Sequence, residues 1–357
     1  MKTYLVTGGA GFIGSNFILY MLGKYNDICI VNVDKLTYAG NLENLKSIQD
    51  DRRYIFVQAD ICNKVHMEDL FAQYHPEYVV NFAAESHVDR SILSPEVFAA
   101  TNVMGTVTLL NVARSSWEEK DGTYGSHKFL QVSTDEVYGS LSIDEPEVFF
   151  TEETPIAPHS PYSASKAAAD LFVIAYGDTY GFPINITRCS NNYGPYQFPE
   201  KLIPLMINNV LQHKDLPVYG DGLNVRDWLY VEDHCKAIDM VVQDGIVGEV
   251  YNIGGHNERP NIYIVQSIID YVVQNIDGTV SNDLIKYVED RKGHDRRYGI
   301  DPAKIKHDLG WYPETDFETG IKKTIRWYID NNDWVQNVVN GAYREYYADM
   351  YEGRKIL

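Results

Sequence analysis

Short apolar runs recur along roughly the first 190 residues, and most of them end at a polar residue or a glycine. Such runs are typical of buried strands, whereas the stretch from Asn102 to Trp117 has the apolar spacing of an amphipathic helix. Strands that alternate with helices form a parallel sheet covered on both faces. We therefore expect an α/β fold with a Rossmann-type doubly wound parallel sheet. The expected strands lie at 4–7, 28–33, 54–59, 78–84 and 184–188, with another beginning at Phe129, and the expected helices lie at 15–22, 102–117 and 162–180.

The pattern changes after residue 188. Residues 191–199 have the composition of loops, and short strands are expected at 216–219 and 226–231. Helices are expected at 203–213, 231–242 and 318–331, and residues 248–254 return towards the sheet. No repeat or obvious linker separates two units, so the smaller C-terminal α/β substrate domain should be interleaved with the first. We predict a first domain over 1–187, plus returning segments near 226–254, and a second over the remainder of 188–357.

A glycine-rich loop follows the first expected strand directly. Gly8, Gly11 and Gly14 recur every third residue between that strand and a helix, as in a turn that brings backbone N–H groups up to a pyrophosphate. Twenty residues past Gly14, the second strand ends at Asp34. A carboxylate there would accept hydrogen bonds from an adenosine ribose and repel a 2′-phosphate, which favours NAD over NADP. The alternative is an aspartate that caps the next turn.

The ends of the next two expected strands complete this cofactor site. Asp60 and Ile61 are placed to meet an adenine edge, and the small residues Ala83 and Ala84 allow a cofactor to lie against the backbone. A polar loop follows, in which His87 is interpreted as a hydrogen-bonding residue.

Candidate catalytic groups follow the strand that begins at Phe129. This strand ends in the hydroxyl of Thr134 and the adjacent carboxylates of Asp135 and Glu136. Further on, Tyr162 and Lys166 lie four residues apart and so share one face of a helix. A hydroxyl, a phenol and an ammonium suit alcohol oxidation, and the carboxylates add an acid and a base. Alone, the acids are also typical of a helix start, and the Tyr–Lys pair of a solvated helix.

Charge and cysteine content narrow the class of protein. A formal net charge of −19 over 357 residues argues against nucleic acid or an anionic membrane as the main partner. The four cysteines are far apart and match no metal-ligand spacing, so we expect them to be reduced and buried, with no metal site. The chain opens directly into a strand and has no apolar run of about 18 residues. These features predict a soluble cytoplasmic protein.

The densest basic run of this acidic chain lies at Arg291 to Arg297. It is either a solvated loop or a clamp for a diphosphate, which arginine binds in bidentate fashion.

With these residues in hand, the chain resembles the extended short-chain dehydrogenase/reductase family of nucleotide-sugar enzymes. The glycine loop and the Tyr-x-x-x-Lys pair are common to the whole superfamily. The Thr-Asp-Glu sequence is similar to that of its dehydratases, whereas the related epimerases have a serine and no acid pair there. The matching segments span nearly the whole length, at 7–14, 34–41, 84–91, 133–139, 162–166, 188–195, 226–228 and 291–295.

The resemblance implies a tightly bound NAD, regenerated in each turnover, and a nucleotide-diphosphate sugar as substrate, most closely dTDP-glucose. It also implies a homodimer, formed through the helices near 102–117 and 162–180. The residues implied for the cofactor are Gly8, Gly11, Phe12, Ile13, Gly14, Asp34, Lys35, Thr37, Asp60, Ile61, Ala83, Ala84, Tyr162 and Lys166. Those implied for the sugar and diphosphate are Ser86, Thr134, Asn191, Lys201, Arg226, Asn261, Arg291 and His294.

This resemblance leads to a hypothesis for the chemistry. Tyr162 as phenolate takes the proton of the sugar C4 hydroxyl while hydride leaves C4 for NAD, with Thr134 at the same oxygen. The C4 ketone acidifies the C5 proton, which Glu136 removes while Asp135 protonates the departing C6 hydroxyl. Hydride then returns to C6. Tyr162 needs its pKa depressed by about three units, roughly 4 kcal/mol, which Lys166 and the positive nicotinamide could supply.

Three alternatives stay open at this point. A UDP-sugar 4-epimerase needs only the tyrosine, the lysine and NAD, which would leave the Thr-Asp-Glu sequence unexplained. A UDP- or CDP-glucose 4,6-dehydratase differs only in the base, which neither spacing nor composition distinguishes. A non-catalytic NAD sensor would have little reason to combine the acids with the Tyr–Lys pair.

Overall fold

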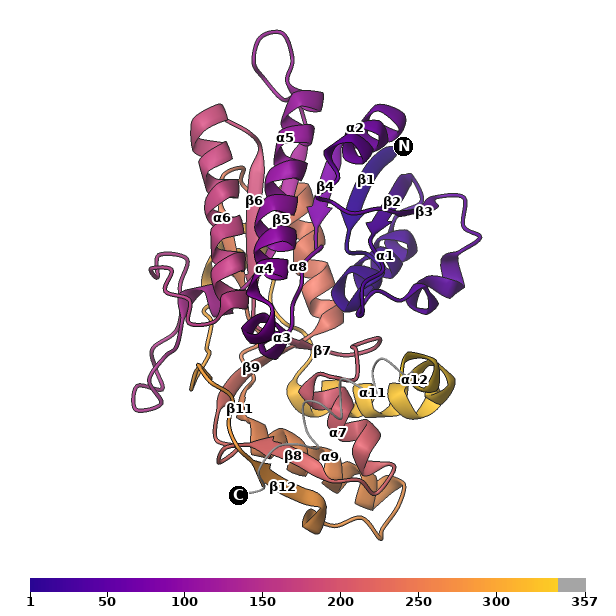
Figure 1. Cartoon of the computed structure of the whole chain (residues 1–357), viewed down its shortest axis with the longest axis vertical. Coiled ribbons are helices and arrows are strands. Elements are labelled where there is room, and N and C mark those ends of the chain that lie inside the picture. Colours follow the sequence, from indigo (N-terminus) through magenta and orange to yellow (C-terminus); the bar gives the residue numbers. More distant parts are fainter. Residues whose placement is uncertain (340–357) are drawn as a thin grey trace.

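The computed structural model describes residues 1–339, which form a larger and a smaller lobe along the long axis of the molecule (Figure 1). The end of the predicted second domain, residues 340–357, lies outside the described residues.

A seven-stranded sheet forms the centre of the larger lobe, with the order β10-β6-β5-β4-β1-β2-β3. Every ladder in it is parallel. The predicted doubly wound α/β fold is therefore confirmed. The strands are β1 (Lys2–Thr7), β2 (Ile28–Asp34), β3 (Tyr54–Gln58), β4 (Tyr78–Asn81), β5 (Lys128–Thr134), β6 (Ile184–Cys189) and β10 (Val250–Ile253).

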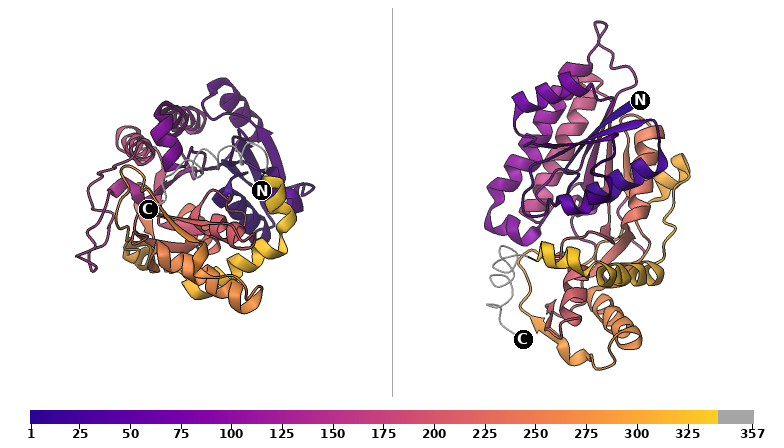
Figure 2. Two further views of the ribbon diagram at one scale, coloured as in Figure 1. Left: turned by 60° about the horizontal axis from the view of Figure 1, so that its bottom comes forward. Right: turned by 90° about the vertical axis from the view of Figure 1, so that its right-hand side faces the viewer.

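Helices cover both faces of this sheet (Figure 2). Alternation of side chains along β1 decides which residue meets which layer, because successive residues of a strand point to opposite faces. Tyr4 and Val6 pack with α1 and α8, whereas Leu5 packs with α2, α5 and α6. These helices are α1 (Phe12–Lys24), α2 (Lys64–Tyr74), α5 (Thr106–Trp117), α6 (Pro161–Tyr180) and α8 (Val231–Asp244).

The smaller lobe is built from the later part of the chain around its own apolar core (Figure 2). It contains a three-stranded sheet, β11-β9-β7, and a two-stranded sheet, β12-β8. Its elements are β7 (Asn191–Tyr193), α7 (Leu202–Val210), β8 (Leu216–Tyr219), β9 (Val225–Tyr230), β11 (Glu258–Pro260), α9 (Asn261–Asn275), η4 (Asn282–Leu284), β12 (Ile285–Val288), α11 (Phe317–Asp330) and α12 (Asn332–Val338). Helix α10 (Ala303–Leu309) packs instead beside β10 and α8.

The chain passes between the lobes more than once, because β10 joins the large sheet whereas β9 pairs with β7 and β11. The exact division into two domains stays a prediction. The remaining short elements precede or follow strands of the large sheet: η1 (Leu42–Ile48), α3 (Val88–Leu93), α4 (Pro95–Phe98), the π-helix η2 (Ala99–Gly105) and the 3-10 turn η3 (Asp135–Tyr138).

Several expectations about local structure are wrong. Asn191–Tyr193 is a strand and not a loop, because it pairs in parallel with Trp228–Tyr230. The helix expected to reach residue 213 ends at Val210, and the chain then turns through His213 at a φ of 51°. Cys189 and Cys235 are buried as expected, but Cys29 and Cys62 are only half-buried. All four are free thiols.

Candidate active site

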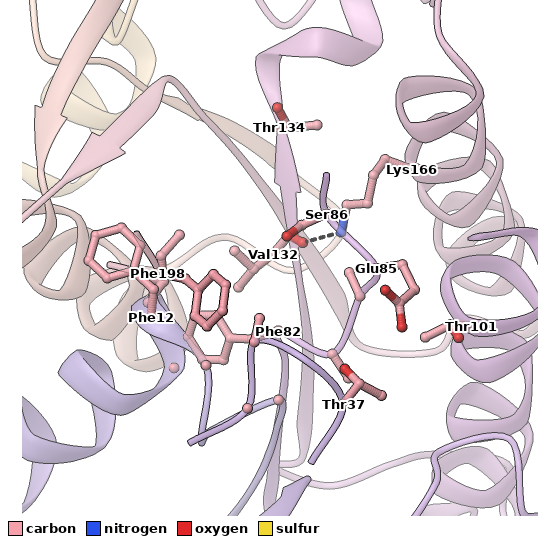
Figure 3. Close-up of a pocket in the computed structure, with 18 of the residues that line it drawn as sticks. Phe12, Thr37, Phe82, Glu85, Ser86, Thr101, Val132, Thr134, Lys166 and Phe198 are labelled. Atoms are coloured by element: carbon pink, nitrogen blue, oxygen red, sulfur yellow. Dashed lines mark hydrogen bonds between the residues drawn. The ribbon is translucent and has the colours of Figure 1, made fainter. Parts of the chain in front are cut away.

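A cavity of about 300 Å³ lies where the carboxyl ends of the parallel strands meet the smaller lobe (Figure 3). Its walls include residues at or just after the ends of β1 to β6, together with Gln197, Phe198, Glu200 and Lys201. Strand order reverses between β1 and β4, and ligands of open α/β sheets bind beside such a switch point.

One end of the cavity is shaped by the glycine loop. Gly8 has a φ of +67°, and a Cβ there would lie 2.7 Å from the backbone nitrogen of Ala83. Helix α1 starts after Gly11 with no side-chain cap and no acidic residue in its first turn. Its first N–H groups are thus available to an anion beside the cavity, as a pyrophosphate requires.

The acidic residues after the next strands are held in place. The carboxylate of Asp34 accepts the N–H of Ala10 at 2.9 Å and that of Leu36 at 2.8 Å, and the residue is 8% exposed. Asp60 forms an ion pair with Lys35 at 2.8 Å. This arrangement fits NAD: a phosphate-binding loop, a carboxylate at the ribose position and a second one further along. All the predicted cofactor residues line this cavity, and their individual contacts stay predictions.

Strand β5 delivers the acid pair to the cavity. The hydroxyl oxygen of Thr134 accepts the N–H of Glu136 at 3.2 Å and caps the 3-10 turn Asp135–Tyr138. The turn closes at Gly139, with a φ of +91°. Two neighbours in a regular strand would point to opposite faces. Because the chain turns at Asp135, both carboxyls line the same cavity, which is the geometry that the mechanism requires.

The surroundings of the two carboxyls differ. Burial raises the pKa of Asp135 well above its ordinary value, and the charge of Glu136 raises it further. Burial also raises the pKa of Glu136, but the charges of Arg291, Arg226 and Lys201 oppose it. These causes favour Asp135 as the acid of the pair and Glu136 as its base, because the three cations oppose the rise in the pKa of Glu136.

Helix α6 carries the Tyr–Lys pair. Ser160 caps it through a reciprocal pair of bonds with Ser163, and Pro161 occupies its first turn. Tyr162 and Lys166 follow on the cavity side. The Lys166 ammonium donates to the carbonyl of Val132 at 2.7 Å (Figure 3).

The pKa of Tyr162 differs from the one that the proposed chemistry needs. Burial, then Glu136, raises the pKa of the Tyr162 phenol well above its ordinary value, and the hydrogen bond with Thr134 only partly offsets this. Burial lowers the pKa of Lys166, which the charge of Asp170 raises. In the chain by itself Tyr162 is thus a neutral phenol, and its activation requires additional positive charge. The predicted effect of Lys166 on it stays a prediction.

Cationic side chains gather beside Glu136. Besides Arg226 and Arg291, this group contains Lys201, which donates to the carbonyl of Ser86 at 3.1 Å. Burial, then Arg291 and Arg226, lowers the pKa of His294 to about 4. In a chain of net charge −19, this concentration of positive charge is suited to a diphosphate.

The predicted substrate residues divide into two groups. Ser86, Thr134, Asn191 and Lys201 line the cavity, whereas Arg226, Asn261, Arg291 and His294 lie outside its lining. Two of the latter group act on Glu136 through their charge, as described above. Asn261 opens α9 with a buried side-chain oxygen that accepts no bond within residues 1–339.

The basic run is neither purely a solvated loop nor purely a clamp. Arg297 is 3% exposed and binds the carbonyls of Val148 and Pro146, and Arg296 pairs with Asp221 at 2.8 Å. Arg291 of this run belongs to the cationic group beside Glu136.

Several cavity residues were missed by sequence reasoning. Phe82 and Phe198, the latter from the smaller lobe, lie on one wall beside the predicted Phe12, and Glu85 and Thr101 lie on another (Figure 3). Sequence offers no signal for Phe198, because it comes from the other lobe. Glu200, a further lining residue, is 4% exposed and pairs with Arg90 at 3.3 Å. Its position next to Lys201 was the one available hint.

Two classes of site find no support within residues 1–339. No group of three or more histidine, cysteine, aspartate or glutamate side chains there could hold a metal ion. Nor does that part of the chain contain a helix with the length and apolarity to cross a membrane.

Comparison with known proteins agrees with this arrangement. The family model described as GDP-mannose 4,6 dehydratase matches residues 5–324. A dTDP-glucose 4,6-dehydratase of Neisseria meningitidis serogroup B is 53% identical over 350 residues, which cover 96% of this chain and 98% of that protein.

Solved structures are similar over almost the whole chain. A dTDP-glucose 4,6-dehydratase of Bacillus anthracis in complex with NAD is 50% identical, with a TM-score of 0.85, and covers 95% of this chain and 100% of its own. A dTDP-glucose 4,6-dehydratase of Streptomyces venezuelae, solved with NAD and a second ligand, is 43% identical, with a TM-score of 0.86, and covers 94% and 99%.

Proposed function

The chain belongs to the GDP-mannose 4,6 dehydratase family and, within it, to the dTDP-glucose 4,6-dehydratases, and from this premise we propose that it dehydrates dTDP-glucose to dTDP-4-keto-6-deoxyglucose with NAD. The observation that carries the proposal is the acid pair. Asp135 and Glu136 reach one cavity together with Tyr162 and Lys166. An epimerase has no use for an additional acid and base at that point, so the pair argues for loss of water.

The division of labour among the residues follows from their surroundings. When bound, NAD supplies the acceptor for the hydride of C4 and the donor that returns it to C6. Tyr162 removes the proton of the C4 hydroxyl, at an oxygen that Thr134 also contacts. Glu136 takes the proton from C5, which a carboxylate can remove only after C4 has become a ketone. Asp135, whose pKa is raised by burial, gives its proton to the hydroxyl that leaves C6.

The diphosphate of the substrate would neutralise the cationic group beside Glu136. Lys201, Arg226 and Arg291 all act on the Glu136 carboxylate and lower its pKa. A bound dianion would compensate those charges and so strengthen the base when the substrate is in place. Ser86, Asn191, Asn261 and His294 complete the proposed substrate contacts.

The deciding experiment is incubation with dTDP-, UDP- and CDP-glucose, followed by mass spectrometry. Loss of one water from dTDP-glucose alone is the expected result. A product of unchanged mass with inverted C4 would indicate an epimerase. Loss of water from UDP- or CDP-glucose instead would assign a different base to the substrate. Protein that retains NAD but leaves all three sugars unchanged would favour a sensor.

We propose in addition that the chain is a homodimer. Helix α6 exposes Leu171 and Phe172 at 54% and 43%, and Met104 on the π-helix η2, which packs beside α6, is 58% exposed. Apolar side chains gathered in this way are typical of a covered surface. Light scattering of the purified protein tests this, and a monomer would reject it. Cytoplasmic localisation stays a prediction from the sequence.

A further inference from the structure

A chain of hydrogen bonds joins helix α12 of the smaller lobe to the glycine loop of the larger one. The helix lies on the side of the smaller lobe that faces α1 (Figure 1). The indole N–H of Trp334 donates to the side-chain oxygen of Asn44 across 2.8 Å, and the Asn44 amide donates to the backbone carbonyl of Ala10 across 3.0 Å. All three residues are buried. The two bonds therefore connect the lobes in a place that is shielded from water.

At the inner end of this chain, both peptide groups of Ala10 are hydrogen-bonded. Its N–H donates to the carboxylate of Asp34 at 2.9 Å, and its carbonyl accepts from Asn44 and from the backbone N–H of Asn41. The carbonyl of Ala10 and the N–H of Gly11 belong to one planar peptide, so a bond that holds the first also sets the direction of the second. Helix α1 begins directly after Gly11, without a side-chain cap. Asn44 thus helps to set the end of the loop at which the phosphates of the cofactor are expected.

The outer end of the chain is anchored in an aromatic cluster of the smaller lobe. The ring centroid of Trp334 lies 5.1 Å from that of Trp327 and 6.1 Å from that of Tyr328. The hydroxyl of Tyr328 donates in turn to the backbone carbonyl of Gln197, which lines the cavity. The packing that places Trp334 therefore also supports the cavity wall that the smaller lobe supplies.

We propose that Trp334, acting through Asn44, is a positioning residue that retains NAD on the glycine loop. This rests on the proposed place of NAD in the cavity. Without the indole N–H, the Asn44 amide loses the partner that fixes its orientation, and it holds the carbonyl of Ala10 less firmly. The loop then turns away from the phosphates more easily, and the cofactor leaves faster.

Retention of the cofactor matters in a reaction that oxidises and then reduces the same sugar. In the proposed chemistry the reduced cofactor has to stay in the site until its hydride returns to C6. Escape before that step would end the turnover with an oxidised sugar. Trp334 ties the loop that holds the cofactor to the lobe that is proposed to hold the sugar, so the two ligands are kept in place together.

The experiment measures the release of NAD from the diluted holoenzyme, by filtration and assay of the free cofactor. Trp334→Phe removes the indole N–H but keeps an aromatic ring, and Asn44→Ala removes the link to Ala10. We expect each variant to release NAD roughly ten-fold faster, the usual effect of losing one buried hydrogen bond. The double variant should be no faster than Asn44→Ala, because the two residues act in series. The matched control is Trp327→Phe, the same change in the same cluster, which should release NAD at the wild-type rate.

A second readout separates positioning from a general loss of stability. In Trp334→Phe, the NAD concentration that gives half-maximal dehydration should rise with the release rate, whereas kcat at saturating NAD should stay close to the wild-type value. A residue that only supports the packing of the smaller lobe would instead lower the temperature of unfolding and leave the release rate of NAD unchanged.

Release of NAD at the wild-type rate in Trp334→Phe would overturn the proposal, even if Asn44→Ala releases it faster, because Asn44 would then brace the loop without α12. Should Trp334→Phe fail to fold, Asn44→Ala carries the test, and wild-type release in that variant would overturn the proposal as well. The release assay contains no sugar. Protein that holds NAD through Trp334 but leaves dTDP-glucose unchanged would therefore contradict the proposed function alone.

Discussion

The backbone N–H of Glu136 donates to the hydroxyl oxygen of Thr134 across 3.2 Å, at the residue where β5 ends. This bond starts the turn that brings two neighbouring carboxyls to one cavity, and Thr134 thereby has two uses. Its hydroxyl caps the turn and also lowers the pKa of the Tyr162 phenol. The groups proposed for oxidation and for elimination are consequently set by one strand end.

Replacing Glu136 by glutamine should separate elimination from oxidation. The amide has the same shape but cannot accept the C5 proton, so we expect loss of water to slow about 10²- to 10⁴-fold. Oxidation at C4 should continue because Tyr162 is unchanged. A single turnover followed by mass spectrometry and by the absorbance of the reduced nicotinamide measures both steps. The control is the exposed Glu147→Gln, and water loss at the wild-type rate in Glu136→Gln would refute the assignment.

Asp170→Asn should lower the stability of the fold and also the pKa of Lys166. Asp170 pairs with Arg188 at 2.9 Å, and both side chains are at most 3% exposed. Breaking a buried pair leaves an uncompensated charge and costs about 3–5 kcal/mol of unfolding free energy. The Asp170 charge also raises the pKa of Lys166, so its loss lowers that pKa further.

The pH profile tests the second effect. Activity that needs a charged Lys166 is lost as the pH rises through its pKa, and the alkaline limb of kcat/KM should therefore move to lower pH in Asp170→Asn. Urea unfolding measures the loss of stability in parallel. Asp178→Asn, an exposed change on the same helix, is the control. An alkaline limb that stays in place would show that Asp170 does not sustain the Lys166 charge.

Gly8→Ala should destabilise the protein by more than the strain of a positive φ accounts for. Gly8 and Gly181 have similar φ angles of +67° and +61°, but an added Cβ meets the backbone of Ala83 at Gly8 and nothing within 4 Å at Gly181. We expect Gly181→Ala to cost about 1 kcal/mol. Gly8→Ala should cost more and should also release NAD, because the loop must move away from β4. Thermal unfolding and bound NAD measure this, and equal effects would contradict the expected clash.

The larger lobe could be predicted from sequence because its signals are local. Apolar runs that end in glycine or acid fix its strands, and the Gly8 to Gly14 loop, Asp34 and the Tyr162–Lys166 spacing each lie within one strand–helix unit. The sequence does not predict the turn at Asp135; the turn is only a requirement of the proposed mechanism, because both carboxyls have to reach one sugar. Its cause is the hydroxyl cap from Thr134, which the sequence does not announce.

The smaller lobe was harder to predict because its contacts are between distant segments. Strand β7 exists through pairing with β9, some 37 residues later along the register Asn191↔Trp228, and its own composition favours a loop. The wall formed by Phe198 and the partnership of Glu200 with Arg90 likewise depend on the packing of the two lobes. Such relationships follow from tertiary structure and not from local spacing.

His234 should make the protein sensitive to acid. It is fully buried beside Asn192, with Nδ1 2.9 Å from the side-chain oxygen, and burial lowers its pKa from 6.5 to about 3. A group whose pKa is depressed in the folded state contributes stability above its unfolded pKa and loses it as the pH falls. The loss should begin near pH 6.5 and approach about 1.4 kcal/mol per pH unit below it, until the pH nears 3.

His234→Gln should therefore be less stable at neutral pH but show a shallower fall in urea midpoint between pH 7 and pH 5. The exposed His213→Gln should keep the wild-type slope, and an identical slope in His234→Gln would mean that another group governs acid unfolding.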